Sequence, residues 1–312
     1  MSAPVAVGGG WWSLAILLLI GCQARGNEGR AQPNVAEFKS TTAFSYVEKQ
    51  LSFGPRIPNT PGHDKMGAWL LTELRARADT VIVQSFVQKT SKGQTLKLSN
   101  YFAQFHPKAA DRILFLAHWD TRPFADKSAN LGQQRLPVPG ANDGASGVAV
   151  LLGVADALKA KPVPATVGVD LLFVDGEDYG DFSDSTETLL GSRYFATHLP
   201  AGYTTLFAVL LDMVGDKDLD IQQEGYSLAN AAEVVQRVWQ TADRLGYSRY
   251  FQPRAGETLT DDHVPLQRAG IRAIDVIDFN FPYHHTTDDT IDKVSAQSLQ
   301  IVGDVAVALV RQ

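Results

Sequence analysis

The feature that most constrains the fold is a series of β-rich, apolar runs separated by helical patterns. Several of these runs, among them 112–119 and 167–177, are apolar almost throughout rather than at every second residue. A strand of this kind has to be covered by other elements on both faces, as the strands of parallel sheets are. The sequence therefore predicts a single α/β domain with a mixed, mostly parallel central sheet flanked by helices.

The expected elements alternate along most of the chain. The predicted strands occupy residues 80–87, 99–105, 112–119, 167–177, 206–215 and 271–279. The predicted helices occupy residues 44–53, 63–78, 146–159, 188–197, 229–245 and 295–311. Because ligands bind beyond the carboxyl ends of the strands in open α/β sheets, the residues that follow each strand are the first candidates for a site.

The first residues differ in character from the rest of the chain. An apolar run at 11–20 is too short to span a bilayer as a stable helix, and it is soon followed by Cys22, the only cysteine. This arrangement resembles the lipobox of a bacterial lipoprotein, in which Cys22 carries the lipid; the alternatives are an anchor helix and an uncleaved signal. We expect residues 1–22 to be a lipoprotein-type signal segment and the polar residues 23–36 to be a flexible tether. The protein would then be exported and membrane-anchored, facing the periplasm or the cell surface, with this lipid as its only membrane contact.

Charge and cysteine content exclude one class of partner and one class of covalent link. The formal net charge is -6 and the sequence pI is about 5.6. The chain has no arginine-rich or aromatic-interleaved basic stretch, so it lacks the electrostatic footprint of a nucleic-acid-binding protein. A single cysteine also excludes disulfides within the chain.

Side chains of the types that bind zinc gather at the ends of the predicted strands. They are His118 and Asp120 at the end of one strand, Glu177 and Asp178 at the next, Asp212 at a third, and His284 and His285 after the last. Three or four His, Asp or Glu ligands with an open position make a catalytic zinc site. These residues therefore predict a metal centre at this edge of the sheet.

The stretch GANDGASG at 140–147 places Asp143 directly before a small-residue helical pattern. Asp is a favoured N-cap residue because its carboxylate accepts backbone N–H groups of the first turn, so capping is one interpretation. The other interpretation is a metal ligand, and the imidazoles and carboxylates at the neighbouring strand ends favour it. The long loop at 125–140 that leads to Asp143 is expected to border the site.

An ordered set of motifs resembles those of the M28 zinc metallopeptidase family, and within it the glutaminyl cyclase branch: AHWD, GANDGASG, DGED, LLDMVGD, DDHVPLQRAG and YHHTTDD. The resemblance extends from about residue 43 to the C-terminus. It implies a zinc-aminopeptidase-like α/β sandwich that forms a catalytic domain over residues 37–312. It also implies an enzyme that acts on the N-termini of peptides or proteins.

The resemblance implies a zinc site and, in some members of the family, a second metal. The single Zn²⁺ of a cyclase would be held by Asp143, Asp178 and His285. In the aminopeptidases two metals are bound, and His118 and Asp212 would help to hold the second. Asp120 would be the acid that orients His118.

The same resemblance implies catalytic and pocket residues. Glu177 would be the general acid and base, and Asp212 and Asp261 would form a hydrogen-bonded carboxylate network with it. Like-charge repulsion among these groups would raise the pKa of Glu177, which suits a group that takes up and releases a proton. The candidates for the wall of the substrate pocket are Phe281 and His284. His284 stands where animal cyclases have a Trp; the alternative is that it is an ordinary loop histidine.

Three functions from different classes are compatible with this resemblance and these candidate residues. The first is a zinc-dependent acyltransferase that converts an N-terminal Gln to pyroglutamate with release of ammonia. The second is a metal-dependent aminopeptidase, and the third is a non-catalytic binding protein of the same family. The presence of Glu177 argues against the third, because pseudoenzymes commonly lose that group. A second metal would favour the aminopeptidase, because peptide hydrolysis needs an activated water.

Overall fold

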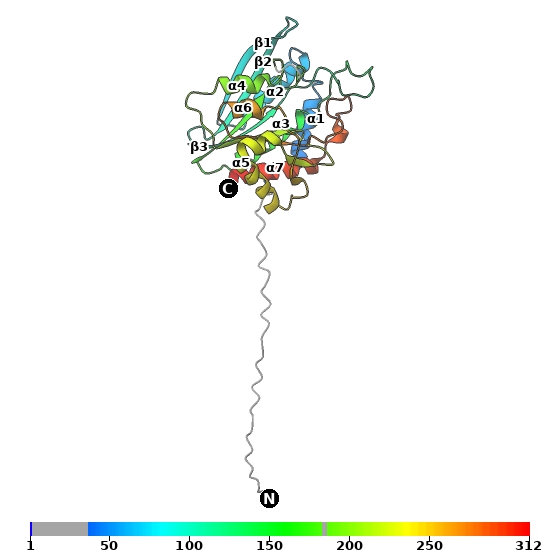
Figure 1. Cartoon of the computed structure of the whole chain (residues 1–312). Coiled ribbons are helices and arrows are strands. Elements are labelled where there is room, and N and C mark those ends of the chain that lie inside the picture. Colours follow the sequence, from blue (N-terminus) through cyan, green and yellow to red (C-terminus); the bar gives the residue numbers. More distant parts are fainter. Residues whose placement is uncertain (2–36, 183–185) are drawn as a thin grey trace. The chain divides into compact units, whose positions relative to one another are not determined.

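The computed structural model describes residue 1, residues 37–182 and residues 186–312 (Figure 1). The predicted signal segment at 1–22, with Cys22, and the predicted tether at 23–36 lie outside the described residues, apart from Met1. Within the described part of the chain, no helix is long and apolar enough to cross a membrane.

A six-stranded sheet forms the centre of the domain. Its strands lie in the order β1(Thr80–Lys89), β2(Thr95–Phe105), β4(Val167–Val174), β3(Asp111–His118), β5(Phe207–Asp212) and β8(Ala273–Ile277). The β1–β2 and β2–β4 pairs are antiparallel, whereas the β4–β3, β3–β5 and β5–β8 pairs are parallel. The sheet is therefore mixed and mostly parallel, and the carboxyl ends of its parallel strands share one edge.

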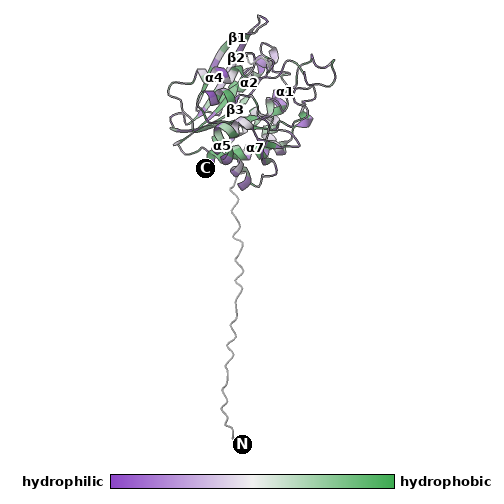
Figure 2. Cartoon of the chain, in the orientation of Figure 1, coloured by the Kyte–Doolittle hydropathy of each residue, from purple (hydrophilic) through white to green (hydrophobic). Residues whose placement is uncertain are grey.

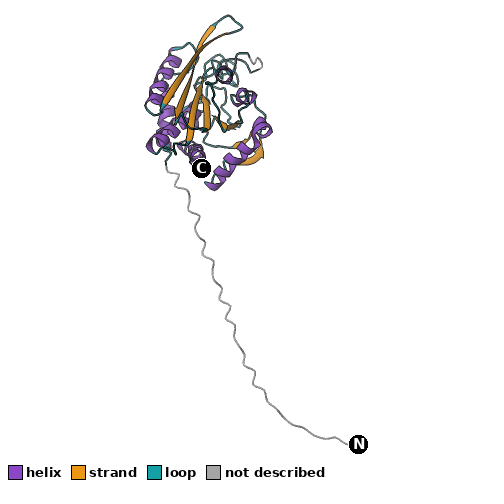
Figure 3. Cartoon of the chain, turned by 90° about the vertical axis from the view of Figure 1, so that its left-hand side faces the viewer, coloured by secondary structure: helices purple, strands orange, loops and turns teal. Residues whose placement is uncertain are grey.

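Helices cover both faces of this sheet (Figure 3). The buried apolar side chains on one face form a core cluster with those of five helices: α1(Ser40–Leu51), α2(Pro61–Arg75), α3(Ala145–Ala160), α5(Gly225–Arg244) and α7(Ala296–Arg311). A second cluster lies under two shorter helices, α4(Leu190–Thr197) and α6(His263–Arg268). In β3, Phe115 belongs to the first cluster and its neighbours Leu114 and Leu116 to the second. Figure 2 colours the described residues by their hydropathy, with the hydrophobic ones in green. The predicted α/β sandwich is confirmed.

The structure also contains elements that periodicity does not reveal. β2 begins at Thr95 rather than at residue 99, because Leu96 and Leu98 are buried and extend the strand. A separate two-stranded parallel sheet consists of β6(Ile221–Gln223) and β7(Phe251–Ala255). β6 has only three residues, which is too short to show an alternation of apolar and polar residues. β7 contains a proline, and a proline in a short run makes a strand a poor prediction from sequence.

Helix α3 packs very closely against the sheet at the point where the candidate site begins. A Cβ atom on Gly147 would lie 2.1 Å from the backbone oxygen of Leu211 in β5 and 3.0 Å from the Cβ atom of Ala117 in β3. Only glycine lets the helix backbone approach the strands this closely. The contact fixes the first turn of α3 against the ends of β3 and β5.

Gly147→Ala is therefore expected to lower the free energy of unfolding by about 1–3 kcal/mol, as overpacking of a core does, although alanine is the better helix former. Chemical denaturation of the full chain followed by circular dichroism measures this change. Gly132→Ala is the control, because its Cβ atom would meet only the side chain of Asn130, at 3.3 Å. A Gly147→Ala protein as stable as the parent would contradict the close packing of α3 on the sheet.

Candidate functional site

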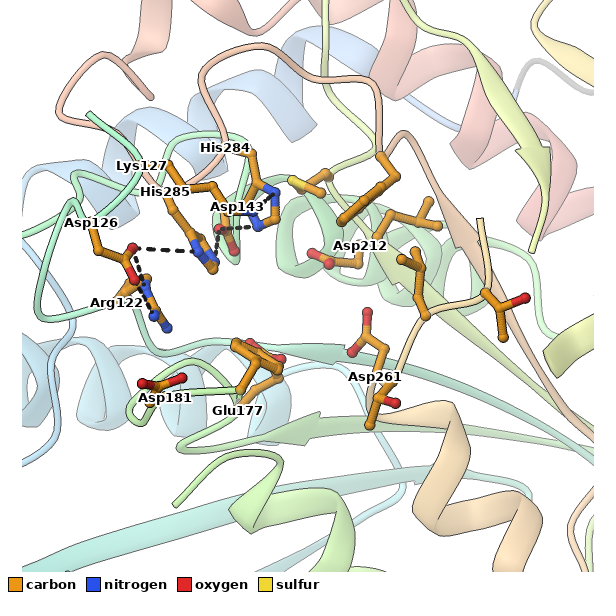
Figure 4. A pocket seen from close by; sticks show the side chains of 17 residues that line it. Arg122, Asp126, Lys127, Asp143, Glu177, Asp181, Asp212, Asp261, His284 and His285 are labelled. Carbon is orange, nitrogen blue, oxygen red and sulfur yellow. Dashed lines mark hydrogen bonds and ion pairs between the residues drawn. The ribbon is translucent and has the colours of Figure 1, made fainter. Parts of the chain in front are cut away.

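The carboxyl ends of the parallel strands open into a cavity of about 350 Å³ (Figure 4). Polar side chains from distant parts of the sequence line it: Asp143, Glu177, Asp212, Asp261, His284 and His285. Apolar side chains complete the wall, among them Met213, Leu259 and Ile277. The structure thus brings these six sequence-predicted residues to one cavity.

Asp143 does not cap helix α3. The N-cap residue is Gly144, with a φ of 87°, and no side chain of the described residues caps the first turn. The Asp143 carboxylate lies near imidazoles instead: its Oδ1 atom is 3.1 Å from Nε2 of His118, and its Oδ2 atom is 3.6 Å from Nε2 of His285. The geometry therefore excludes the capping interpretation.

His285 links Asp143 to Asp178. Its Nε2 atom is 3.1 Å from Oδ1 of Asp178 and 3.6 Å from Oδ2 of Asp143, so both carboxylates converge on one imidazole nitrogen. Arg122 donates a hydrogen bond of 2.9 Å to Oδ1 of Asp178 and forms an ion pair with Asp126. The residues expected to hold one zinc ion are thus neighbours, and Arg122 orients one of them.

His118 contacts Asp143 from the end of β3. Its Nε2 atom is 3.1 Å from Oδ1 of Asp143 and 3.3 Å from Oδ1 of Asp212. Its Nδ1 atom is 3.6 Å from Oδ1 of Asp120, which is too long for a hydrogen bond. Donor atoms of His118, Asp143 and Asp212 lie within 4.8 Å of one another, as do those of Asp143, His284 and His285. Either group could hold a metal ion.

Two buried aspartates hold the loops that carry these side chains. Asp120 accepts the backbone N–H groups of Glu177 and the next residue, at 3.1 and 3.2 Å. Asp289 accepts the backbone N–H groups of Asn142 and the next residue, at 2.8 and 3.1 Å. Each carboxylate fixes two successive backbone groups and so sets the direction of a loop. A contact of this kind leaves no periodic signal in a sequence.

The donor set fits a metal ion. Oδ2 of Asp143 and Oδ2 of Asp178 are buried and have no hydrogen-bond partner among the residues that the structure describes. Burial of a charged oxygen without a partner is costly, and a bound cation removes that cost. Imidazole and carboxylate donors in this number suit Zn²⁺. These two oxygens therefore support a metal centre beside Asp143.

Glu177 follows β4, and its carboxyl group lines the cavity. Burial raises the pKa of this carboxyl well above its usual value; the charge of His118 opposes the shift, and the charges of Asp178 and Asp261 add to it. Burial, rather than the like-charge repulsion expected from the sequence, is the larger cause. Burial also raises the pKa of Asp212, and it raises that of Asp261 to about 7. Asp261 can therefore hold a proton near neutral pH.

Two further acids lie behind Asp261. Asp262 and Asp275 are completely buried, and burial raises the pKa of both well above the usual value. The charge of Asp261 adds to the upward shift of both pKa values. The group of carboxyls with raised pKa values thus extends further into the domain than the sequence-predicted pair of Asp212 and Asp261.

The two candidates for the pocket wall differ in position. The His284 side chain lines the cavity. Phe281 lies one layer deeper, because its ring is buried in a small core cluster with Met213. The aromatic rings at the cavity belong to Phe182 and Phe279 instead. The position expected for Phe281 is corrected accordingly: it supports the wall and does not form it.

The polar residues of the wall that were not singled out in the sequence include Arg122, Asp126 and Lys127. They follow β3 in an irregular segment, where no period shows which side chains point inward. For Asp126 and Lys127, the length of the loop at 125–140 is the signal that indicated a border of the site.

Comparisons with known proteins give relatives in sequence and in structure. The sequence profile of Peptidase family M28 matches residues 100–310. A glutaminyl-peptide cyclotransferase-like protein of Bos taurus is 29% identical over 262 residues, which cover 75% of this chain and 66% of that protein's length. The structure of a leucine aminopeptidase precursor from Bacteroides thetaiotaomicron is 36% identical with a TM-score of 0.85, covering 89% of this chain and 99% of that one. The structure of Porphyromonas gingivalis glutaminyl cyclase is 38% identical with a TM-score of 0.84, covering 87% and 97%.

Zn²⁺ is expected to stabilise the folded chain, by about 2.7 kcal/mol when the free ion is at 100 times its Kd. Asp143→Asn should abolish this stabilisation, because it removes the carboxylate that contacts His118 and His285. Asp288→Asn is the control, since Asp288 is exposed in the loop that follows β8. Thermal unfolding of chelator-treated protein with and without the ion measures the effect. Equal stabilisation of the Asp143→Asn protein would contradict a metal centre at this residue.

Proposed function

The chain belongs to peptidase family M28, and on this premise we propose that it is a zinc-dependent glutaminyl-peptide cyclotransferase. It would convert an N-terminal Gln of a peptide or protein to pyroglutamate and release ammonia. The observation that carries the proposal is the buried Glu177 carboxyl, which has a raised pKa and lines the same cavity as Asp143 and His285. Similarity to proteins named as glutaminyl cyclases or cyclotransferases supports the same assignment.

The proposed reaction moves one proton between two nitrogen atoms. The α-amine nitrogen of the substrate attacks the carbon of the Gln side-chain amide, so that a C–N bond forms, the bond from that carbon to the amide nitrogen breaks, and ammonia leaves. Glu177 would take a proton from the attacking amine and give it to the departing nitrogen. Burial raises the pKa of this carboxyl above its usual value, which makes it a stronger base toward the attacking amine.

The other polar residues of the cavity would support this step. Asp143, Asp178 and His285 would hold the zinc ion, which as a Lewis acid would polarise the side-chain amide carbonyl. Arg122 would keep Asp178 in place through its hydrogen bond of 2.9 Å. Asp261 would favour the protonated form of Glu177, because its charge opposes a further negative charge nearby.

A metal aminopeptidase is the second candidate, and one observation favours it. Donor atoms of His118, Asp143 and Asp212 lie within 4.8 Å of one another and could hold the second metal that activates a water for hydrolysis. We prefer the cyclase because the carboxylate that only a second metal would need, that of Asp212, already has an imidazole partner: its Oδ1 atom is 3.3 Å from Nε2 of His118. By contrast, Oδ2 of Asp143 and Oδ2 of Asp178 have no hydrogen-bond partner among the described residues.

The N-terminal residues indicate where in the cell the protein would act. Residues 1–22 would be a lipoprotein signal segment, Cys22 would carry the lipid, and residues 23–36 would tether the catalytic domain to a membrane. The support is the apolar run at 11–20 and the single cysteine. An exported enzyme anchored in this way would meet its peptide substrates in the periplasm or at the cell surface.

Glu177→Gln is expected to lower kcat by about 10²- to 10⁴-fold, the usual contribution of a general acid or base. Metal binding should persist, because Glu177 is not one of the proposed ligands. Ammonia release from a peptide with an N-terminal Gln and the zinc content of the protein measure the two effects. Glu257→Gln is the matched control, since it removes the same charge from an exposed position before α6. Full activity of the Glu177→Gln protein would exclude the proposed role.

The reaction itself is tested with two peptides, one beginning with Gln and one with Leu. The zinc-loaded full chain is incubated with both, and mass spectrometry follows the products. A cyclase is expected to remove ammonia from the Gln peptide alone and to contain one zinc ion per chain. Release of whole N-terminal residues, together with two metals per chain, would instead identify an aminopeptidase.

A further inference from the structure

Lys127 and His284 form a hydrogen-bonded pair in the cavity wall, which the proposed reaction does not yet use. Nζ of Lys127 is 3.0 Å from Nδ1 of His284, and Nε2 of the same ring is 3.9 Å from Oδ2 of Asp143 (Figure 4). The Phe279 ring covers the pair, with its centroid 5.4 Å from that of His284 and 5.7 Å from Nζ of Lys127. All of these residues line the cavity.

Hydrogen bonds on either side of this pair hold together the two segments that carry it. The N–H group of Lys127 donates to the carbonyl oxygen of His285 at 3.2 Å. The N–H group of Thr287 donates to Oγ of Ser128 at 3.3 Å. The segment after β3 and the loop after β8 are therefore joined on both sides of the side-chain contact. The His284 side chain is only 15% exposed, so its ring has little freedom to turn away.

The contact with Lys127 decides which nitrogen of His284 carries the hydrogen. A lysine ammonium has three N–H donors and no acceptor, so Nδ1 of His284 has to accept. In the neutral imidazole the other nitrogen, Nε2, then carries the hydrogen and is a donor. An Nε2–H group cannot coordinate a metal, although donor atoms of Asp143, His284 and His285 lie within 4.8 Å of one another.

We propose that His284 is a hydrogen-bond donor for the carbonyl oxygen of the substrate rather than a metal ligand, and that Lys127 is the residue that positions it. This inference rests on the proposed function, in which the acceptor is the side-chain amide carbonyl of an N-terminal Gln. The carbonyl oxygen gains negative charge as the α-amine attacks. A donor that is fixed in advance stabilises this charge without reorganisation.

Nitrogen NMR of histidine tests the position of the hydrogen independently of activity. In the full chain labelled with ¹⁵N-histidine, we expect His284 to have an unprotonated Nδ1 and a protonated Nε2. Lys127→Met keeps the aliphatic stem and removes the donor, so it should reduce this tautomer, whereas Lys65→Met at an exposed position should not. The spectrum of His284→Gln identifies the signal among the seven histidines. A protonated Nδ1 in the parent, or an unchanged tautomer in Lys127→Met, would overturn the role of Lys127.

Substitutions of His284 separate a donor from a metal ligand. His284→Phe keeps a ring and removes the donor, and it is expected to lower kcat for the Gln peptide by about 10²-fold, the usual loss for one such donor. His284→Gln restores an N–H group near the position of Nε2 and should recover much of that loss. Both variants should bind Zn²⁺ as tightly as the parent in a chelator competition. Weaker Zn²⁺ binding by both variants would make His284 a ligand and overturn the proposal.

These outcomes separate this inference from the proposed function. If the chain released N-terminal residues instead of ammonia, the proposed function would fail, and the proposed acceptor would fail with it. The tautomer and the Zn²⁺ affinity would still decide whether His284 is a donor or a ligand. If the chain is a cyclase and His284→Phe is as active as the parent, the proposed function stands and this inference fails.

Discussion

The site depends on the burial of one carboxylate, that of Asp143, against imidazole rings. His118 approaches one of its oxygens, and His285 approaches the other. Burial by itself raises the pKa of the Asp143 carboxyl, but the hydrogen bond and the charge of His118 hold it below its usual range. The carboxylate therefore stays ionised inside the protein. A buried charge requires partners on several sides, and this requirement brings the end of β3, the start of α3 and the loop after β8 to one point.

The surrounding scaffold uses carboxylates in a second way. Asp120 and Asp289 each accept two successive backbone N–H groups and hold the loops that carry Glu177 and Asp143. The acids at this edge of the sheet thus divide into those that hold backbone, those that face imidazoles and those that hold a proton. Residue type alone does not distinguish these tasks, because each of them uses the same carboxylate oxygen.

The sequence was informative wherever one period or one topological rule applied over many residues. The long apolar runs predicted the strands of the main sheet, and the rule for strand ends predicted that Glu177, Asp212 and His285 would meet. Irregular segments gave no comparable signal. Lys127 and Phe279 point into the cavity from such segments, whereas Phe281 turns into the core. The orientation of each of these side chains is set by tertiary contacts that no local pattern records.

The strand order β4–β3–β5–β8 has a consequence for biosynthesis. His285 comes 142 residues after Asp143 and 107 residues after Asp178 in the sequence. It follows β8, which joins the main sheet by pairing with β5. Because a chain is made from its N-terminus, both carboxylates leave the ribosome well before this imidazole does. Of the donors at this site, a nascent chain then offers a metal the carboxylates and His118, and the full set exists only once the last strand has docked. Metal capture and completion of the sheet would therefore be one event.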